Sequence, residues 1–213
     1  MTQRSQVLLE PRKSPVQARS AASVDAILEA TVQVLLSVGK ERLTTTKVAS
    51  RAGVSVGTLY QYFPNKSSLL QAALTRHLDE VAGAMRRVCR EERGKSLKEM
   101  ATALINAFLE AKMRDAKTSV ALYSVSSDVD GAKIALRNGV ETNKALVGML
   151  ITARDRLTKD PQIVASMLMS AMAGVSRRLL ESGDPEKHFE GLRQELVFLV
   201  CVYLEACTVR ESV

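Results

Sequence analysis

Apolar residues recur every three or four positions along most of the chain, which is the period of an α-helix. The first such segment runs from Val16 to Val38, where Gly39 ends it, and the second runs from Lys66 to about Glu92. Further helices are expected over "SLKEMATALINAFLEAKM" and over residues 116–126, 129–157, 161–182 and 187–208. No run alternates apolar and polar residues between turn signals, as a half-buried strand would. The pattern therefore predicts an all-α fold.

Two short helices are expected between the first two long ones, in "LTTTKVASRAGVSVGTLYQYFPNKSSLL". Thr44 or Thr45 can cap the first, which would extend through residue 52, and Ser55 can cap the second, which would extend through residue 63. Gly53 supplies the turn between them. Two short helices around a glycine turn make a helix-turn-helix.

The same stretch contains "GVSVG", a formal match to the G-x-S-x-G nucleophile elbow of serine hydrolases, with His188 downstream. Such an elbow needs a buried strand that leads into the serine, and a sheet to carry it. The residues before Gly53 are "TTTKVASRA", whose apolar positions share one helical face. A hydrolase that uses Ser55 is therefore the disfavoured alternative, and we expect no enzyme.

The second short helix sorts into two faces when residues are placed about 100° apart. Leu59 and Phe63 should face inward with Val54. The outward and flanking positions hold Gly57, Thr58, Tyr60, Gln61 and Tyr62. A short helix of this kind suits a DNA major groove, where glutamine reads base edges and tyrosine hydroxyls reach phosphates.

Charge supports a polyanion partner for this part of the chain. The formal net charge is +7, and residues 1–66 hold nine Lys and Arg against four Asp and Glu, a net of +5. Residues 1–15 combine Arg4, Arg12 and Lys13 with two prolines and no periodicity, so they are expected to form a disordered basic arm. Thr45, Thr46 and Lys47 begin one helix and Lys66 begins another, which places helix N-termini and cations on both sides of the expected recognition helix.

This segment resembles the DNA-binding segment of the TetR family of bacterial repressors over residues 23–75, about a quarter of the chain. The matching residues are Thr45, Val48, Ala49, Ala52, Gly53, Val54, Ser55, Gly57, Leu59, Tyr60, Tyr62, Phe63, Lys66 and Leu69. The resemblance implies base or phosphate contacts from Thr46, Val56, Gly57, Thr58 and Gln61, and phosphate contacts from Thr45, Tyr60, Tyr62 and Lys66. With the cap Ser55 and the cation Lys47, these residues form the expected DNA-binding set.

The resemblance also implies an N-terminal three-helix DNA-binding domain, followed by a larger helical domain that binds an effector and forms a homodimer through the last two helices. We expect the arm at residues 1–15, the DNA-binding domain at 16–66 and the helical domain at 67–213. The segment "LRQELVFLVCVYLEA" is apolar on more than one stripe, more than one buried face requires. A twofold dimer implies a palindromic double-stranded DNA operator.

The expected function is a ligand-responsive transcriptional repressor that releases its operator when a small molecule binds the helical domain. Candidate pocket residues are apolar (Phe108, Met113, Tyr123, Met149, Met167 and Met172) or polar (Asn106, Arg114, Asn143 and Arg177). Each apolar one is also a candidate core residue, and each polar one a candidate solvated residue. A helical dimer that binds DNA without any effector is a further alternative.

Other features of the composition narrow the function. Cys89, Cys201 and Cys207 form no C-x-x-C pair, and His77 and His188 have no cysteine nearby, so neither a metal site nor a cofactor is predicted. No run reaches the roughly 20 consecutive apolar residues of a membrane span, so we expect no membrane partner and a cytoplasmic location.

Overall fold

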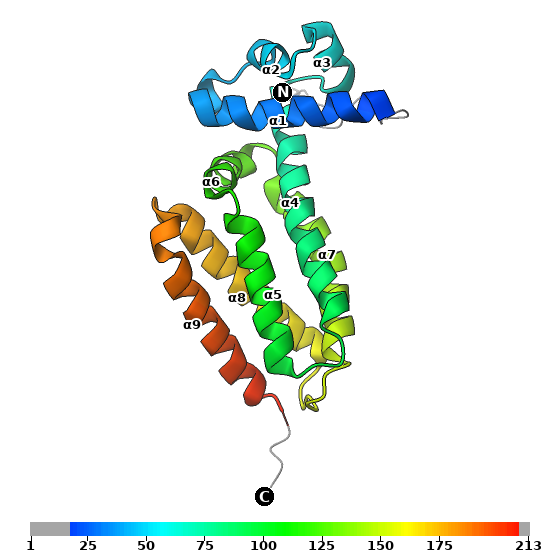
Figure 1. Cartoon of the computed structure of the whole chain (residues 1–213), viewed down its shortest axis with the longest axis vertical. Helices are drawn as coiled ribbons and strands as arrows, with labels where there is room; N and C mark the ends of the chain where they lie inside the picture. The colour runs from blue at the N-terminus through cyan, green and yellow to red at the C-terminus, as the bar shows by residue number, and fades with distance from the viewer. Residues whose placement is uncertain (1–17, 209–213) are drawn as a thin grey trace, which may run out of the picture. The chain divides into compact units, whose positions relative to one another are not determined.

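The structure is a computed structural model that describes residues 18–208. Within these residues the chain forms α-helices, one short 3₁₀ turn and no strand (Figure 1). The elements are α1 (Ala18–Arg42), α2 (Thr45–Ala52), α3 (Val56–Tyr62), α4 (Lys66–Glu91), α5 (Leu97–Met113), α6 (Ala116–Val125), η1 (Ser126–Asp128), α7 (Gly131–Leu150), α8 (Pro161–Glu181) and α9 (Pro185–Glu205). The predicted all-α fold is confirmed, and the expected basic arm lies outside the described residues.

The chain divides into two compact units. The first comprises the chain up to His77 together with Val120–Ile134, and the second comprises Leu78–Ser119 together with Ala135 onward. The helices α4, α6 and α7 therefore each contribute to both units. The functional boundary expected between residues 66 and 67 stays a prediction.

In the first unit α2 packs against α1 and α3 packs against α2, and all three helices bury apolar residues. Ile27 of α1 and Leu59 of α3 are fully buried, and so is Val48 of α2. The hydroxyl of Thr31, also fully buried, donates to the carbonyl of Ile27 at 2.8 Å, so that no polar group is stranded in this core. Gly39, with φ 75° and ψ 168°, breaks the helical backbone of α1, as the sequence predicts.

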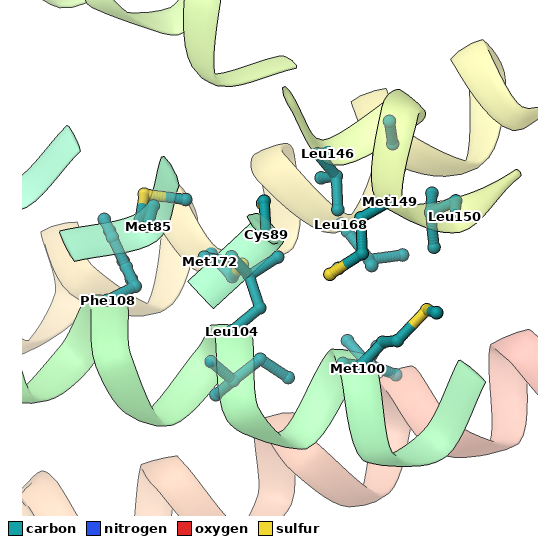
Figure 2. Packing of buried hydrophobic residues seen from close by; sticks show 14 of the residues in the cluster. Met85, Cys89, Met100, Leu104, Phe108, Leu146, Met149, Leu150, Leu168 and Met172 are labelled. Atoms are coloured by element: carbon teal, nitrogen blue, oxygen red, sulfur yellow. The ribbon is translucent and has the colours of Figure 1, made fainter. Parts of the chain in front are cut away.

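The second unit is built around α5, which packs against α8 and α9. Its core is rich in methionine and leucine, and Figure 2 shows the side chains that meet there from several helices. The labelled residues are Met85, Cys89, Met100, Leu104, Phe108, Leu146, Met149, Leu150, Leu168 and Met172. Unbranched methionine side chains fill irregular gaps that leucine would leave.

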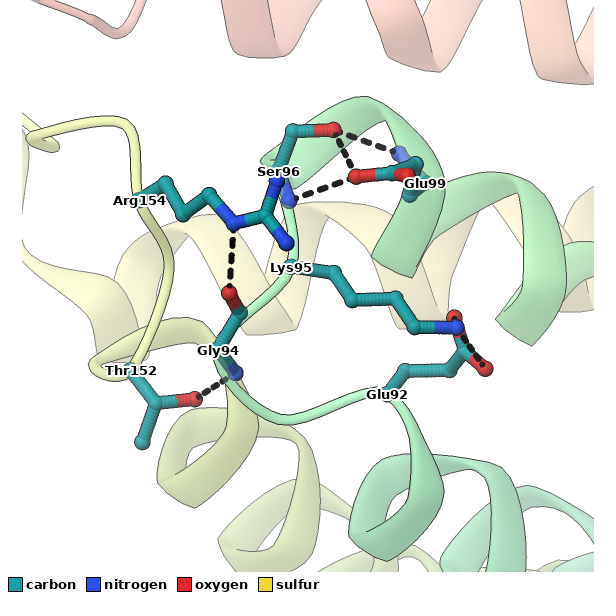
Figure 3. Close-up of polar contacts among 7 residues, drawn as sticks. All are labelled: Glu92, Gly94, Lys95, Ser96, Glu99, Thr152 and Arg154. Carbon is teal, nitrogen blue, oxygen red and sulfur yellow. Dashed lines mark hydrogen bonds and ion pairs between the residues drawn. The ribbon is translucent and has the colours of Figure 1, made fainter.

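The helix expected over residues 129–157 is wrong at its C-terminal end, because α7 ends at Leu150. The segment that follows bonds the turn between α4 and α5 instead (Figure 3). The Thr152 hydroxyl accepts from the N–H of Gly94 at 3.0 Å, and the Arg154 guanidinium donates to the Gly94 carbonyl at 2.9 Å. The Asp155 carboxylate accepts from the N–H of Leu97 at 2.6 Å. These bonds satisfy backbone groups that the end of α4 and the start of α5 leave free.

Two helices pass a simple test for membrane spans. Ser20–Arg42 and Pro161–Glu181 are long and apolar enough, by length and composition alone, to cross a membrane. Neither helix is a run of about 20 consecutive apolar residues, because polar or charged residues interrupt both, so the expectation from the sequence is not contradicted. Both also carry buried residues of the helical cores, such as Ile27 of α1 and Leu168 of α8, and core helices of soluble proteins pass the same test.

The start of α5 carries the capping box that its S-x-x-E sequence predicts. The Ser96 hydroxyl accepts from the N–H of Glu99 at 3.3 Å, and the Glu99 carboxylate accepts from the N–H of Ser96 at 2.9 Å (Figure 3). Hydrogen bonds from the Ser96 hydroxyl and N–H lower the pKa of the Glu99 carboxyl. The stability that this carboxylate contributes is therefore present above its unfolded-state pKa, and it is lost as the pH falls through the folded-state pKa.

We predict that Ser96→Ala lowers the free energy of unfolding by about 1 kcal/mol at neutral pH, because the helix loses its N-cap. The difference from the wild type should shrink as the pH falls through the folded-state pKa of Glu99. Urea denaturation at a series of pH values measures both effects. Ser50→Ala, at an exposed position of α2, is the control and should cost nothing; equal losses in the two variants would contradict the capping role.

Candidate DNA interface

The turn between α2 and α3 depends on Gly53. Its φ of 68° and ψ of 28° lie in the left-handed region, which a residue with a Cβ adopts only with strain. Its N–H donates to the Ser50 carbonyl at 3.3 Å, and the next N–H, of Val54, donates to the Ala49 carbonyl at 3.0 Å. At the other end of α2, Thr44 is the cap, and its hydroxyl accepts from the N–H of Lys47 at 3.3 Å. The two predicted helices therefore meet in a fixed turn.

Ser55 caps α3. Its hydroxyl oxygen accepts from the N–H of Thr58 at 3.0 Å and lies 2.8 Å from the Thr58 hydroxyl. The element before it is the helix α2, and the part of the chain that the structure describes holds one isolated bridge, between Leu157 and Thr208, in place of any sheet. The strand and the sheet that a nucleophile elbow requires are therefore both missing from the described residues. The hydrolase alternative is therefore wrong, and the serine of "GVSVG" is a helix cap.

The helix α3 has one buried and one exposed face, as its sequence predicts. Leu59 and Phe63 are 0% and 1% exposed. The residues on the other side are exposed (Val56, Gly57, Tyr60 and Gln61) or half-buried (Thr58 and Tyr62). The Tyr60 hydroxyl lies 3.0 Å from the hydroxyl of Thr45 at the start of α2, so this contact joins the two short helices at their outer surface.

The two lysines expected to contact phosphates also make bonds inside the first unit. The ammonium of Lys47 donates to the Arg42 carbonyl at 2.9 Å, and that of Lys66 donates to the Lys40 carbonyl. Both acceptors lie at the end of α1, where Gly39 has broken the helix. An ammonium has three hydrogens, so each lysine keeps donors for a phosphate while it holds the α1 end. The Lys66 bond cannot be predicted from local sequence, because its acceptor lies 26 residues away.

Two further contacts of the first unit, one of them at the end of α1, also cannot be predicted from local sequence. Lys40 forms an ion pair with Asp128 of η1, and this carboxylate raises the pKa of the Lys40 ammonium. The amide of Gln71 donates to the Val129 carbonyl at 3.3 Å in the same unit. These contacts hold residues 128–129 against the helices of the first unit, far from them in sequence.

The start of α4 is a further helix N-terminus on this unit. The Asn65 side-chain oxygen accepts from the N–H of Ser68 at 2.8 Å, which places Asn65 at the cap position that the sequence predicts. Thr46 and Lys47, at the start of α2, are exposed. Two helix starts, each with a lysine, therefore accompany α3 in one compact unit.

The effector candidates are distributed over different environments. Phe108, Met149 and Met172 belong to one buried cluster in the second unit, whereas Met167 is 51% exposed on α8. Asn106 accepts from the guanidinium of Arg193 at 2.9 Å, Arg177 pairs with Glu181, and Asn143 accepts from the amide of Gln162. Met113 and Tyr123 are half-buried, and Arg114 is exposed. The structure thus brings three of the ten candidate effector residues together in one cluster, namely Phe108, Met149 and Met172.

The fold and this surface define the class of the protein as a helix-turn-helix DNA-binding protein. A sequence profile described as "Bacterial regulatory proteins, tetR family" matches residues 27–73, and one described as "Tetracyclin repressor-like, C-terminal domain" matches residues 96–204. The second match alone covers just over half of the chain. The chain belongs to the TetR family. It is a DNA-binding transcriptional regulator and not an enzyme.

Individual proteins are similar to this chain in sequence or in fold. The chain is 25% identical over 174 residues to the nucleoid occlusion factor SlmA of Haemophilus ducreyi, over 77% of this chain and 85% of that protein. It is 46% identical over 55 residues to the HTH-type transcriptional repressor KstR of Mycolicibacterium smegmatis, over 26% and 27% of the two chains. A solved structure described as a TetR-family transcriptional regulator from Mesorhizobium loti MAFF303099 superposes with a TM-score of 0.74 at 18% identity, over 91% of this chain and 100% of that one.

We predict that Ser55→Ala lowers the free energy of unfolding by about 0.5–2 kcal/mol, because α3 loses its N-cap. Ser55→Asn should cost less, since asparagine is also a strong N-cap residue. Urea denaturation followed by circular dichroism measures both. A loss from Ser55→Asn as large as that from Ser55→Ala would show that the hydroxyl does something other than capping.

Proposed function

We propose that this protein is a repressor that binds a palindromic operator as a homodimer and releases it when a small molecule binds the second unit. The observation that carries the proposal is the two-sided α3, which buries Leu59 and Phe63 and leaves Gln61 and Tyr60 exposed. A seven-residue helix with a buried apolar side and an exposed polar side offers its side chains to a groove in DNA.

Each residue of the DNA-binding set has a distinct proposed role. Gln61 reads a base edge, because the glutamine amide matches the paired donor and acceptor of adenine in the major groove. Gly57 lets the backbone come close to the DNA, with Val56 and Thr58 beside it. Phosphate contacts come from the remaining residues, which are Thr45, Thr46, Lys47, Tyr60, Tyr62 and Lys66. Ser55 acts indirectly, by fixing the first turn of α3.

The helix N-termini strengthen the phosphate contacts. The first N–H groups of α2 and α4 point out of the helix ends, where the backbone dipoles favour a negative charge. Lys47 and Lys66 stand at these two starts. The local charge of +5 over residues 1–66 gives the same unit a general attraction to DNA.

We propose that α8 and α9 form the dimer interface. These helices pack on each other and carry apolar side chains that the monomer leaves exposed. The exposed residues are Ile163 (57%), Met167 (51%), Phe198 (66%), Leu199 (58%) and Val202 (48%). Several large apolar side chains that stay exposed on two packed helices favour an interaction site. A twofold pair of readers spaced about 34–36 Å apart fits successive major grooves, which is why the operator is proposed to be palindromic.

The effector is proposed to bind the second unit next to Phe108, Met149 and Met172. Methionine-rich surroundings adapt to ligands of different shape. A ligand weakens operator binding only if it binds better to a dimer conformation with the wrong reader spacing. Met167 fits the dimer surface better than the pocket, because its side chain is exposed beside Ile163. The site of action is the cytoplasm, where the operator lies.

We predict that Gln61→Ala weakens binding to the operator by roughly 5- to 150-fold, which corresponds to the about 1–3 kcal/mol of a bidentate base contact. Binding to non-operator DNA of the same length should change less than twofold. The DNA upstream of the protein's own gene is the first operator to test, by mobility-shift titration at fixed salt. An unchanged ratio of operator to non-operator affinity would contradict the base-reading role.

We predict that Phe198→Glu converts the dimer into monomers, because a carboxylate in an apolar interface loses its hydration. Leu136→Glu is the matched control, since Leu136 on α7 is 71% exposed and lies outside the proposed interface. Sedimentation velocity should show monomers for the first variant and dimers for the second. Dimers in both would mean that the interface lies elsewhere.

The alternative without an effector makes a different prediction. A helical dimer that binds DNA only through its shape and charge would bind the operator but show no stabilisation by any small molecule. A thermal-shift screen, in which bound ligands raise the melting temperature, distinguishes the two.

A further inference from the structure

Lys112 is a half-buried cation at the end of the helix that forms the centre of the second unit. It is the last residue but one of α5, and it follows Ala111, which packs against the core. Phe108, a member of that core, lies four residues earlier and therefore on the same side of the helix. The Lys112 side chain therefore extends from the side of α5 that also carries Phe108, and Figure 2 shows the apolar core around Phe108 and Met172.

Within residues 18–208, the Lys112 ammonium forms no ion pair or hydrogen bond. Several other cations of the same unit do form ion pairs. Lys95, Lys144, Arg177 and Arg193 each pair with a carboxylate. Burial lowers the pKa of Lys112, and no carboxylate contributes to raise it. A partly desolvated charge without a counter-charge is costly in a folded protein. The second unit carries this cost at Lys112.

The backbone around Lys112 is held in place by two other helices. The hydroxyl of Ser119 on α6 donates to the carbonyl of Lys112, which fixes the end of α5 to the start of the next helix. Six residues earlier in α5, the Asn106 side chain accepts from the guanidinium of Arg193 on α9 at 2.9 Å. Arg193 is itself paired with Glu190, so its charge is balanced, whereas that of Lys112 is not. The backbone from which the Lys112 side chain extends is therefore held by the fold.

We propose that Lys112 binds the carboxylate of an amphipathic organic acid whose apolar body lies along Phe108 and the methionines of the second unit. This proposal rests on the proposed function, in which the second unit binds a small-molecule effector. The carboxylate supplies the counter-charge that the protein lacks, and the ammonium offers three donors to it. Much of the desolvation cost of the cation is already present in the unliganded protein, so it does not reduce the affinity. An apolar body suits the methionine-rich core.

The test compares straight-chain acids with the matching alcohols. Hexanoate, octanoate and decanoate are titrated into the full-length protein by isothermal titration calorimetry, beside hexanol, octanol and decanol. For at least one chain length, we expect the wild type to bind the acid about tenfold more tightly than the alcohol, or more, as a charge-assisted hydrogen bond implies. Lys112→Met should bind the acid and the alcohol equally, and Lys112→Arg should keep part of the preference.

The matched control is Lys98→Met, which removes an exposed lysine near the other end of α5. It should keep the full preference for the acid. Three results would each overturn the proposal: an acid preference that survives in Lys112→Met, equal binding of acid and alcohol by the wild type, or no binding of any of these probes. Circular dichroism confirms that each variant is folded before titration.

A separate measurement distinguishes this proposal from the proposed function. Mobility-shift titration without any probe should give the same operator affinity for the wild type, Lys112→Met and Lys98→Met, because Lys112 lies outside the DNA-reading unit. If the wild type fails to bind the operator, the proposed function is wrong. If it binds and a neutral compound, but no acid, releases it, the repressor function stands and the carboxylate site is wrong.

Discussion

The burial of two side chains four residues apart holds the DNA-reading surface together. A helix of seven residues such as α3 does not persist in water alone, because its nucleation cost exceeds what its few hydrogen bonds return. Leu59 and Phe63 anchor it to the first unit, and the Ser55 cap satisfies one of its free N–H groups, that of Thr58. These three residues fix the orientation of α3, and therefore the direction in which its exposed side chains point. The polar face is thus a consequence of the apolar one.

Locally encoded features could be predicted from the sequence. Gly53 and Ser55 define the turn and the second short helix, and Ser96 with Glu99 defines the start of α5. Each of these signals involves residues within four positions of one another, so the chain carries them wherever the segment lies. The same reasoning sorted α3 into its two faces, and it excluded a nucleophile elbow at Ser55 because no strand pattern precedes it.

Features that depend on distant partners could not be predicted. The segment after Leu150 contains no glycine or proline before Pro161, so its helical pattern gave no reason to stop. It stops because Thr152 and Asp155 bond residues 58 positions earlier. Similarly, Lys66 has the position of a phosphate contact, while its bond to the Lys40 carbonyl depends on where α1 ends. For the effector residues, periodicity marked apolar positions but did not separate the buried Met172 from the exposed Met167.

The bonds between the α4–α5 turn and residues 152–155 also bear on the order in which the protein is made. Gly94 and Leu97 are synthesised well before Thr152 and Asp155, because α5, α6 and α7 lie between them in the sequence. Until residues 152–155 are made, the backbone groups of this turn lack these hydrogen-bond partners. The first unit has the same dependence, because it includes residues 120–134. Neither unit is complete when its own first helices emerge. Each unit is therefore completed only by later segments, unlike a domain that is one continuous segment.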